Sequence, residues 1–230
     1  MATLKKVKPS VVGIGLHTPT SRPKNVLSGS GFIVSDGLTV VTNSHVLPDE
    51  LDDNLLQKVA VFVGSGKTAT VRFASIAARS TEHDLAILKI QGKPLPVMKL
   101  ANDNLIDEGS SIAFTGFPIG SVLGLYPVTH RGIIAAITPT VVPAIDSRQI
   151  NLKMLKRMRN PYFVYQLDAT AYPGNSGSAM YNANNGEVLG VINKVFVQDT
   201  KEGVLSKPSG ITYAIPVKYV HQLLNEANAN

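Results

Sequence analysis

Cysteine and tryptophan are absent from this chain of 230 residues, and aromatic residues make up only 6% of it. Without cysteine there are neither disulfide bonds nor thiolate metal ligands, so the stability must come from a packed core. No stretch approaches the roughly 20 apolar residues that a membrane-spanning helix needs. The hydrophobic content of 44%, with 17% charged residues, is typical of a packed globular protein and excludes disorder along the whole chain.

Signals for nucleic-acid binding and for export are missing as well. The net charge of +6 and the isoelectric point near 9.5 favour encounters with anionic surfaces. However, the chain lacks an RNP-type motif, a zinc-finger spacing and an arginine-rich tract with aromatic residues. Residues 1–10 hold lysines but neither a long apolar core nor a cleavage site, so we expect no signal peptide in this sequence. We expect no nucleic-acid partner.

Short runs rich in β-branched residues recur along the chain, separated by Gly, Pro, Asn and Asp. The strands expected in the first half are Val11–Leu16, Gly31–Val34, Leu38–Thr42, Lys58–Val63, Thr70–Ile76 and Leu85–Ile90. Those expected in the second half are Ser111–Thr115, Gly132–Ile137, Tyr162–Leu167, Ser178–Tyr181, Val188–Ile192 and Ile211–Ile215.

Six strands in each half, joined by a polar connector at Ala101–Gly109, predict an all-β fold of two consecutive six-stranded barrels. We expect the first domain at residues 1–105 and the second at residues 106–230. A helix is expected to end the chain, because Pro216 precedes apolar residues that repeat at helical spacing. These are Val217, Val220, Leu223 and Leu224.

Three polar residues stand at the edges of apolar runs, in the order His45, Asp84 and Ser176. Each alone has an ordinary explanation: a hydrogen bond at a strand end, a turn residue, or a serine in a glycine-rich turn. A serine hydroxyl becomes a nucleophile only with a base within hydrogen-bond reach and a carboxylate that orients that base. The sequence Gly174–Gly177 around the serine predicts a tight turn whose N–H groups can bind an oxyanion. The order His, Asp, Ser is that of chymotrypsin-type proteases.

Seven segments that are spread over most of the chain extend this pattern. They are Gly29–Val34, Thr42–Val46, Asp84–Lys89, Gly116–Gly120, Arg131–Ile134, Asp168–Gly177 and Tyr213–Pro216. In this order they resemble the motifs of the HtrA (Deg) branch of trypsin-like serine proteases. The resemblance implies a double β-barrel, cleavage of protein or peptide substrates, and no metal or other cofactor.

The resemblance also implies a role for each residue of the site. Ser176 would attack the scissile carbonyl, while His45 would take its proton and return it to the leaving amine. Asp84 would hold the other N–H of the imidazole. The oxyanion hole would consist of the backbone N–H groups of Gly174 and Ser176, with Asn175 inside the same turn.

A specificity pocket is expected on the same grounds. Trypsin-like selection of Lys or Arg needs a carboxylate six residues before the serine, where this chain has Thr170 beside Ala171. The opposite wall would come from Lys194, Val195 and Phe196. We therefore expect a preference for small to medium apolar residues before the cut.

The chain departs from the family pattern at three points. Ser178 replaces the second glycine after the serine, which also excludes the Gly-x-Ser-x-Gly elbow of lipases. No PDZ domain follows the last helix, and no aromatic-rich segment precedes Phe32, so PDZ regulation and a trimer of the family's kind are not expected. The resemblance favours a periplasmic or secreted location.

Two functions remain as alternatives to proteolysis: a proteolytically silent module that binds peptides or acts as a chaperone, and an esterase. The segment Thr138–Asn160 also has two interpretations. It carries five Lys and Arg residues and a single acid, which is usual for a solvated loop. By resemblance it can instead be a loop that an anionic or peptide ligand orders, together with the serine turn.

Overall fold

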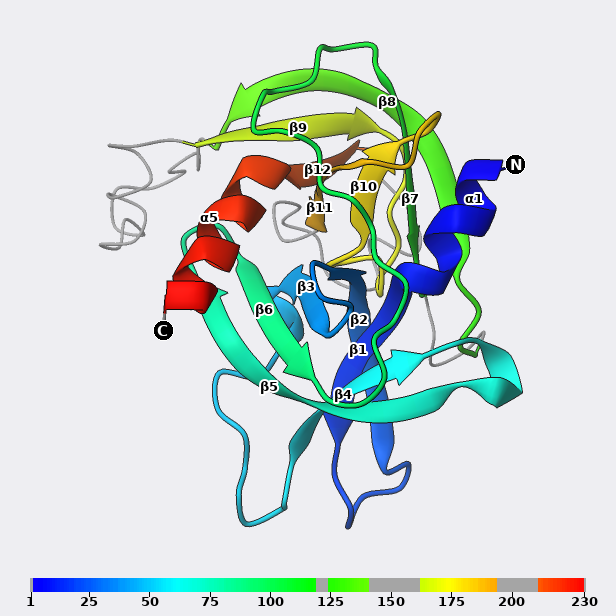
Figure 1. Ribbon diagram of the computed structural model, residues 1–230, viewed down its shortest axis with the longest axis vertical. Coiled ribbons are helices and arrows are strands. Elements are labelled where there is room, and N and C mark those ends of the chain that lie inside the picture. The colour runs from blue at the N-terminus through cyan, green and yellow to red at the C-terminus, as the bar shows by residue number, and fades with distance from the viewer. Residues whose placement is uncertain (1, 119–123, 141–161, 194–210, 230) are drawn as a thin grey trace.

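Two closed antiparallel barrels of six strands each make up the protein (Figure 1). The computed structural model describes residues 2–118, 124–140, 162–193 and 211–229. The all-β double barrel predicted from the sequence is therefore confirmed. Within the described residues, no helix is both long and apolar enough to cross a membrane.

The first barrel has the strand order β1-β2-β3-β6-β5-β4. Its strands are β1 (Val11–His17), β2 (Asn25–Val34), β3 (Thr39–Asn43), β4 (Lys58–Val63), β5 (Thr70–Ser80) and β6 (Leu85–Ile90). Side chains from nearly all of them fill its interior, including Ile14, Ile33, Val40, Val61 and Leu88. The short strand β3 is buried along its whole length.

The second barrel has the order β10-β11-β12-β9-β8-β7. Its strands are β7 (Ser111–Gly116), β8 (Val128–Pro139), β9 (Phe163–Asp168), β10 (Ala179–Asn182), β11 (Val188–Asn193) and β12 (Ile211–Pro216). Its interior includes Phe114, Ile134, Tyr165, Leu167 and Ile192.

A third apolar cluster lies on the seam between the barrels. The first barrel contributes Phe32, Val41 and Ile87, and the second contributes Phe117 and Tyr181, among others. All five side chains are fully or almost fully buried. Apolar burial at roughly 25 cal/mol per Å² makes such a seam strongly favourable, so the two barrels have a fixed relative position.

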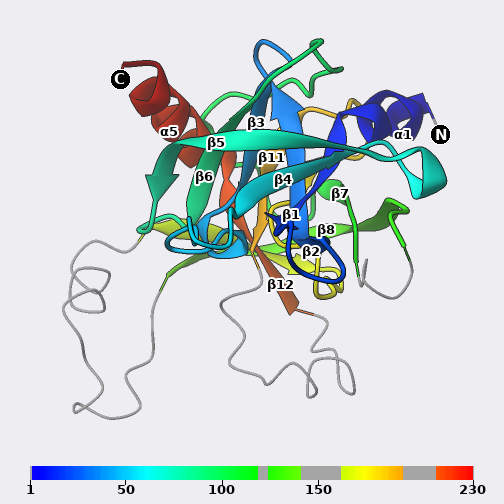
Figure 2. The ribbon, with the colours of Figure 1, turned by 90° about the horizontal axis from the view of Figure 1, so that it is seen from below.

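Two helices, one near each end of the chain, pack against the outside of the barrels (Figures 1 and 2). Helix α1 (Ala2–Val7) lies on the second barrel, where Thr3 Oγ1 donates to the Asn184 carbonyl at 2.8 Å. Helix α5 (Val217–Ala229), which was predicted from the sequence, contacts strands of both barrels, including β5 and β6.

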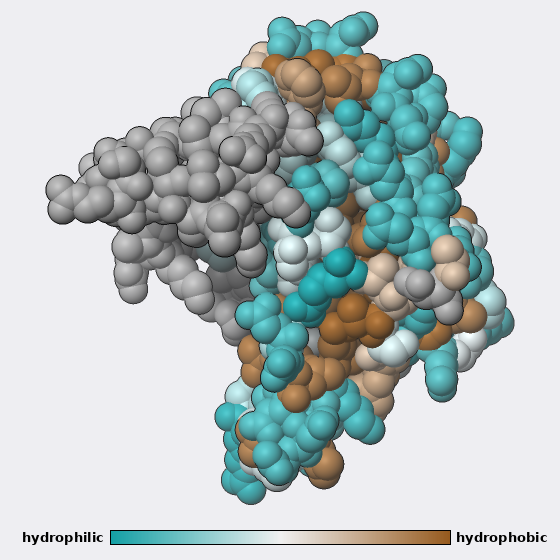
Figure 3. Space-filling view, turned by 90° about the vertical axis from the view of Figure 1, so that its left-hand side faces the viewer, coloured by the Kyte–Doolittle hydropathy of each residue, from teal (hydrophilic) through white to brown (hydrophobic). Residues whose placement is uncertain are grey.

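Short 3-10 helices complete the described structure: η1 (Lys8–Ser10), η2 (Ser44–Val46) and η3 (Gly66–Thr68). On the face shown in Figure 3, hydrophobic residues gather in separate patches among hydrophilic ones. Such a mixture is normal for a protein surface, much of which is apolar.

Candidate active site

Strand pairing brings Asp84 opposite Ser44 and so next to His45. Strands β3 and β6 pair with Asn43 opposite Leu85, so the residues just beyond this pair face one another. His45 lies in η2, directly after β3, and Asp84 lies directly before β6. Two donors hold the Asp84 carbonyl: Asn43 Nδ2 at 2.9 Å and the Ser44 N–H at 3.1 Å. These bonds fix Asp84 at φ +50°, a left-handed conformation that Asp tolerates better than most residues.

The Asp84 carboxylate receives hydrogen bonds from both barrels. Its Oδ1 accepts the His45 backbone N–H at 2.9 Å, and its Oδ2 lies 2.6 Å from His45 Nδ1. Asn193 Nδ2, at the end of β11, donates to the same Oδ2 at 2.8 Å. An ionised carboxylate only accepts, so Nδ1 carries the proton and Nε2 of His45 is left as a base. The sequence analysis gave Asn193 no role.

Ser176 lies in a tight turn in which two backbone N–H groups have no acceptor among the described residues. The N–H groups of Asn175, Gly177 and Ser178 donate to carbonyls of Tyr172, Ile192 and Asn175. The N–H groups of Gly174 and Ser176 donate to nothing in the described part of the chain. Gly174 has φ +98° and Gly177 has φ +85°, which side-chain-bearing residues rarely adopt. These two N–H groups are the pair expected in an oxyanion hole.

The serine turn is held by Ser30 of the first barrel. Ser30 N–H donates to the Ser176 carbonyl at 2.8 Å, and Ser30 Oγ donates to the Gly174 carbonyl at 2.6 Å. The same Oγ accepts the Phe117 N–H at 2.9 Å. Ser30 is fully buried. A Cβ on Gly177 would lie 2.1 Å from the Ser30 carbonyl oxygen, so only glycine permits this approach of the two barrels.

The three residues predicted for the triad thus lie at the junction of the barrels. The His45 side chain is 33% exposed, and Asp84 is 15% exposed. Ser176 is buried, with 7% of its surface exposed. Within the described residues, no hydrogen bond joins Ser176 Oγ to His45, and in ligand-free sites such bonds are often long and tighten when substrate binds.

A ring cluster, formed by His83, Tyr162 and Tyr219, stands beside Asp84. His83 stacks on Tyr219 of helix α5, with ring centroids 4.1 Å apart and planes at 20°. It meets Tyr162 edge-on at 4.9 Å, and the two tyrosines meet at 5.3 Å. Since His83 directly precedes Asp84, the cluster ties the carboxylate's turn to helix α5.

His130 on β8 lies beneath the serine turn. Its Nε2 is 3.4 Å from Asn175 Nδ2, and its ring stacks on Phe114 with centroids 4.9 Å apart. Burial lowers the pKa of His130 below its usual value of 6.5. The ring is therefore neutral at neutral pH and can accept a hydrogen bond from the Asn175 amide. The sequence analysis did not single out His130.

The structure describes only part of the expected specificity pocket. Thr170 is half-buried and Ala171 is buried, with the Ala171 N–H donating to Thr212 Oγ1 at 3.0 Å. Residues 194–196 lie outside the described residues, and so does the basic segment from residue 141 to residue 160. Among the described side chains, no group of three or more His, Asp or Glu gathers to hold a metal ion.

Comparison with known proteins gives one family. The pattern of the trypsin-like peptidase domain matches residues 29–191 of this chain. Among curated proteins, human serine protease HTRA4 is 30% identical over 230 residues, which is 98% of this chain and 40% of that protein. A probable periplasmic serine endoprotease of the DegP-like type from Pseudomonas savastanoi is 29% identical, over 88% of this chain and 35% of that protein. The chain thus spans less than half the length of these curated relatives.

Solved structures show the same fold. A protease from M. tuberculosis in its active form aligns with a TM-score of 0.70 and 22% identity, over 97% of this chain and 82% of that one. A serine endoprotease from Yersinia pestis aligns with a TM-score of 0.67 and 24% identity, over 98% and 65% of the two chains.

Proposed function

The chain belongs to the trypsin-like peptidase domain family, and from this premise we propose that it is a serine endopeptidase that cleaves protein substrates through an acyl-enzyme. The observation that carries the proposal is the Asp84–His45 pair, with 2.6 Å between Oδ2 and Nδ1. Next to it lies the serine turn, in which two N–H groups donate to no acceptor among the described residues. Base, nucleophile and oxyanion donors are the parts that acyl transfer requires.

The proposed reaction begins at Ser176. Its Oγ attacks the scissile carbonyl carbon as Nε2 of His45 takes the hydroxyl proton. The negative charge that develops on the carbonyl oxygen is stabilised by the N–H groups of Gly174 and Ser176. His45 then gives its proton to the leaving amine, and a water molecule, activated by the same histidine, hydrolyses the acyl-enzyme. Asp84 keeps the imidazole oriented throughout and stabilises its charged form.

The two barrels share the work in this proposal. Residues 1–105 supply His45 and Asp84, and residues 106–230 supply Ser176, as the two halves of one protease unit. Thr170 is half-buried and Ala171 is buried, and neither places a carboxylate at the base of the specificity pocket. This supports a preference for small to medium apolar residues before the cut. Several relatives are named as probable periplasmic endoproteases, which supports a periplasmic or secreted location.

Labelling with a fluorophosphonate probe tests the proposal. The probe reacts covalently only with a serine that its own site activates, so we expect labelling of the wild type and none of Ser176→Ala. Ser178→Ala, two residues further along the same turn, is the matched control and should still be labelled. A wild-type chain that the probe does not label would favour the silent peptide-binding module, and turnover of esters without cleavage of peptides would favour an esterase.

A further inference from the structure

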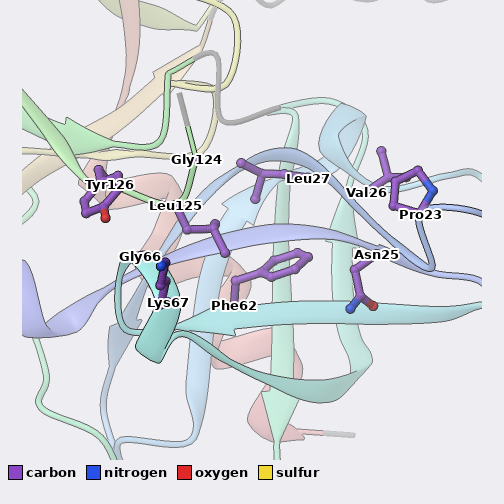
Figure 4. Close-up of a pocket in the computed structure, with 10 residues that line it drawn as sticks. All are labelled: Pro23, Asn25, Val26, Leu27, Phe62, Gly66, Lys67, Gly124, Leu125 and Tyr126. Carbon is purple, nitrogen blue, oxygen red and sulfur yellow. The ribbon is translucent and has the colours of Figure 1, made fainter. Parts of the chain in front are cut away.

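A cavity of about 480 Å³ lies between the first barrel and the segment 124–126 that leads into β8 (Figure 4). Its lining is mainly apolar and includes Val26 and Leu27 of β2, Phe62 of β4, and Leu125 and Tyr126. Val26 and Tyr126 are 51% and 60% exposed, so apolar surface is open to solvent here. Clefts that bind peptide side chains have this character.

Strand β2 connects this cavity to the candidate active site. Leu27 lines the cavity, and two residues further along the strand Gly29 reaches the serine turn. A Cβ on Gly29 would lie 3.0 Å from the Ser176 carbonyl oxygen and 2.8 Å from the methyl groups of Val46, the residue after His45. Because a strand advances about 3.3 Å per residue, the cavity begins about two residues from the serine turn. Strands β2 and β3 are antiparallel with Phe32 opposite Val41, so going back along β2 to Leu27 means going forward past the end of β3, where His45 lies. The cavity therefore lies on the side of His45.

The walls of the cavity are held together by a contact between the barrels. The Gly66 N–H donates to the Leu125 carbonyl at 2.7 Å. Gly66 has φ +57°, and a Cβ there would lie 2.8 Å from the Tyr126 hydroxyl oxygen. The first barrel and the segment 124–126 therefore meet at a position that only glycine fits without strain. The cavity is preformed, and an occupant would not have to create it.

The charges around the cavity are positive. Lys67 lines it, and Arg22 and Lys24 are exposed on the turn between β1 and β2, next to Pro23 and Asn25, which also line the cavity. None of the residues that line it is acidic. An occupant with an apolar side chain and a neighbouring carboxylate would complement both the lining and its charge.

We propose that this cavity binds the part of the substrate that follows the scissile bond, with a large apolar side chain against Leu27 and Phe62 and an acidic side chain near Lys67. The proposal rests on the proposed endopeptidase function. His45 must reach the leaving nitrogen, so the chain that departs lies on the histidine side, where β2 leads into the cavity. An extended substrate places its second or third residue after the cut at that distance.

Two substrate series test the proposal. The first carries a chromogenic leaving group directly after the scissile bond and has no residues there to enter the cavity. The second consists of quenched fluorogenic peptides that continue four residues beyond the bond. These peptides have Leu or Gly at the second position after the bond and Glu or Lys at the third. Val26→Ser and Tyr126→Ser each remove apolar surface from the lining, at side chains that are exposed. Val97→Ser, at a valine of similar exposure (46%) that does not line the cavity, is the matched control.

We expect each cavity variant to lower kcat/KM roughly tenfold for the long peptides with Leu, the size of effect that a hydrophobic subsite gives. The short substrates should be unaffected, and Val97→Ser should change neither series. Lys67→Glu should reverse the preference for Glu over Lys. Equal losses in both series, or no difference between Leu and Gly peptides in the wild type, would overturn the proposal.

A binding measurement separates this proposal from the proposed function. In Ser176→Ala, the affinity for a fluorescent long peptide is measured by anisotropy, with and without Val26→Ser. Weaker binding in the double variant supports peptide binding in the cavity even for a chain that cleaves nothing. Equal affinity in the two variants contradicts it.

Discussion

Ser30→Ala tests whether one buried hydroxyl holds the serine turn. The substitution removes the group that donates to the Gly174 carbonyl and accepts the Phe117 N–H. Phe117 is fully buried, so its N–H would lose its partner away from water, at a cost of about 1–3 kcal/mol. The half-buried Gly174 carbonyl would lose an ordinary hydrogen bond, worth about 1 kcal/mol. We expect the free energy of unfolding to fall by about 2–4 kcal/mol in total.

The same change should reduce catalysis, because Ser30 holds the carbonyl of Gly174, and the N–H of this same residue is one of the two proposed oxyanion donors. Losing one donor costs on the order of 10²–10³ in turnover. The bond from the Ser30 N–H to the Ser176 carbonyl remains, so the turn is loosened and not lost. We expect kcat to fall about 10²-fold, the lower end of that range.

Urea unfolding, peptide turnover and the rate of fluorophosphonate labelling measure these effects. Ser28→Ala is the matched control, since Ser28 lies exposed on the same strand and makes no hydrogen bond to the turn among the described residues. A Ser30→Ala variant that unfolds at the same urea concentration as Ser28→Ala, and is labelled at the wild-type rate, would refute the role of this hydroxyl.

Further predictions concern the Asp84 carboxylate, two histidines and the specificity pocket. Asp84→Asn should lower kcat about 10⁴-fold, because the amide would favour the wrong imidazole tautomer. As the pH falls below about 6.5, His130 takes up a proton in the unfolded chain but not yet in the folded protein, because burial lowers its folded-state pKa. The free energy of unfolding should therefore decrease as the pH falls towards that lowered pKa. Urea titrations at pH 5 and pH 7 should show that His130→Phe removes this contribution to the pH dependence of the free energy of unfolding. His83→Ala should lower kcat roughly tenfold with little change in KM, by releasing the turn of Asp84, and His83→Phe should restore it by keeping the ring stack. A peptide library should show cleavage after Val, Ala, Ile or Leu, and a profile dominated by Lys or Arg would contradict the proposed pocket.

The strands were predictable wherever the apolar runs were bounded by turn residues. Strands β4 and β6 begin and end at the residues predicted for them, Lys58–Val63 and Leu85–Ile90. Strand β5 continues to Ser80, four residues past the predicted end, because a bulge after Ile76 lets the extra residues pair with β6. The extra residues pair with β6 across the turn at residues 81–84, but their own side chains are not typical of a strand and gave no local signal.

Helix α1 was missed for a related reason. It has six residues and a single buried side chain, Val7, which is too little for a helical repeat to show in the sequence. Thr3 and Val7 hold it against the second barrel near Gly186. A helix this short is stabilised by such packing and not by its own propensity.

The candidate site shows the same division between local and distant information. His45, Asp84 and Ser176 were predicted because each has a motif around it. The positions of Ser30 and Asn193 relative to the site could not be predicted, since their partners lie 144 and 109 residues away in the sequence. A buried serine and a strand-terminal asparagine have no local pattern that indicates these contacts.

These two distant contacts have a common consequence. Asp84 of the first barrel is held by Asn193 of the second, while the Ser176 turn of the second is held by Ser30 of the first. Each barrel therefore positions a proposed catalytic residue of the other. Separating the barrels would expose the apolar seam and also leave the Asp84 carboxylate and the Gly174 carbonyl without these donors. The geometry of the site thus depends on the packing of the two barrels, and a change in the seam would act on the carboxylate and the serine turn together.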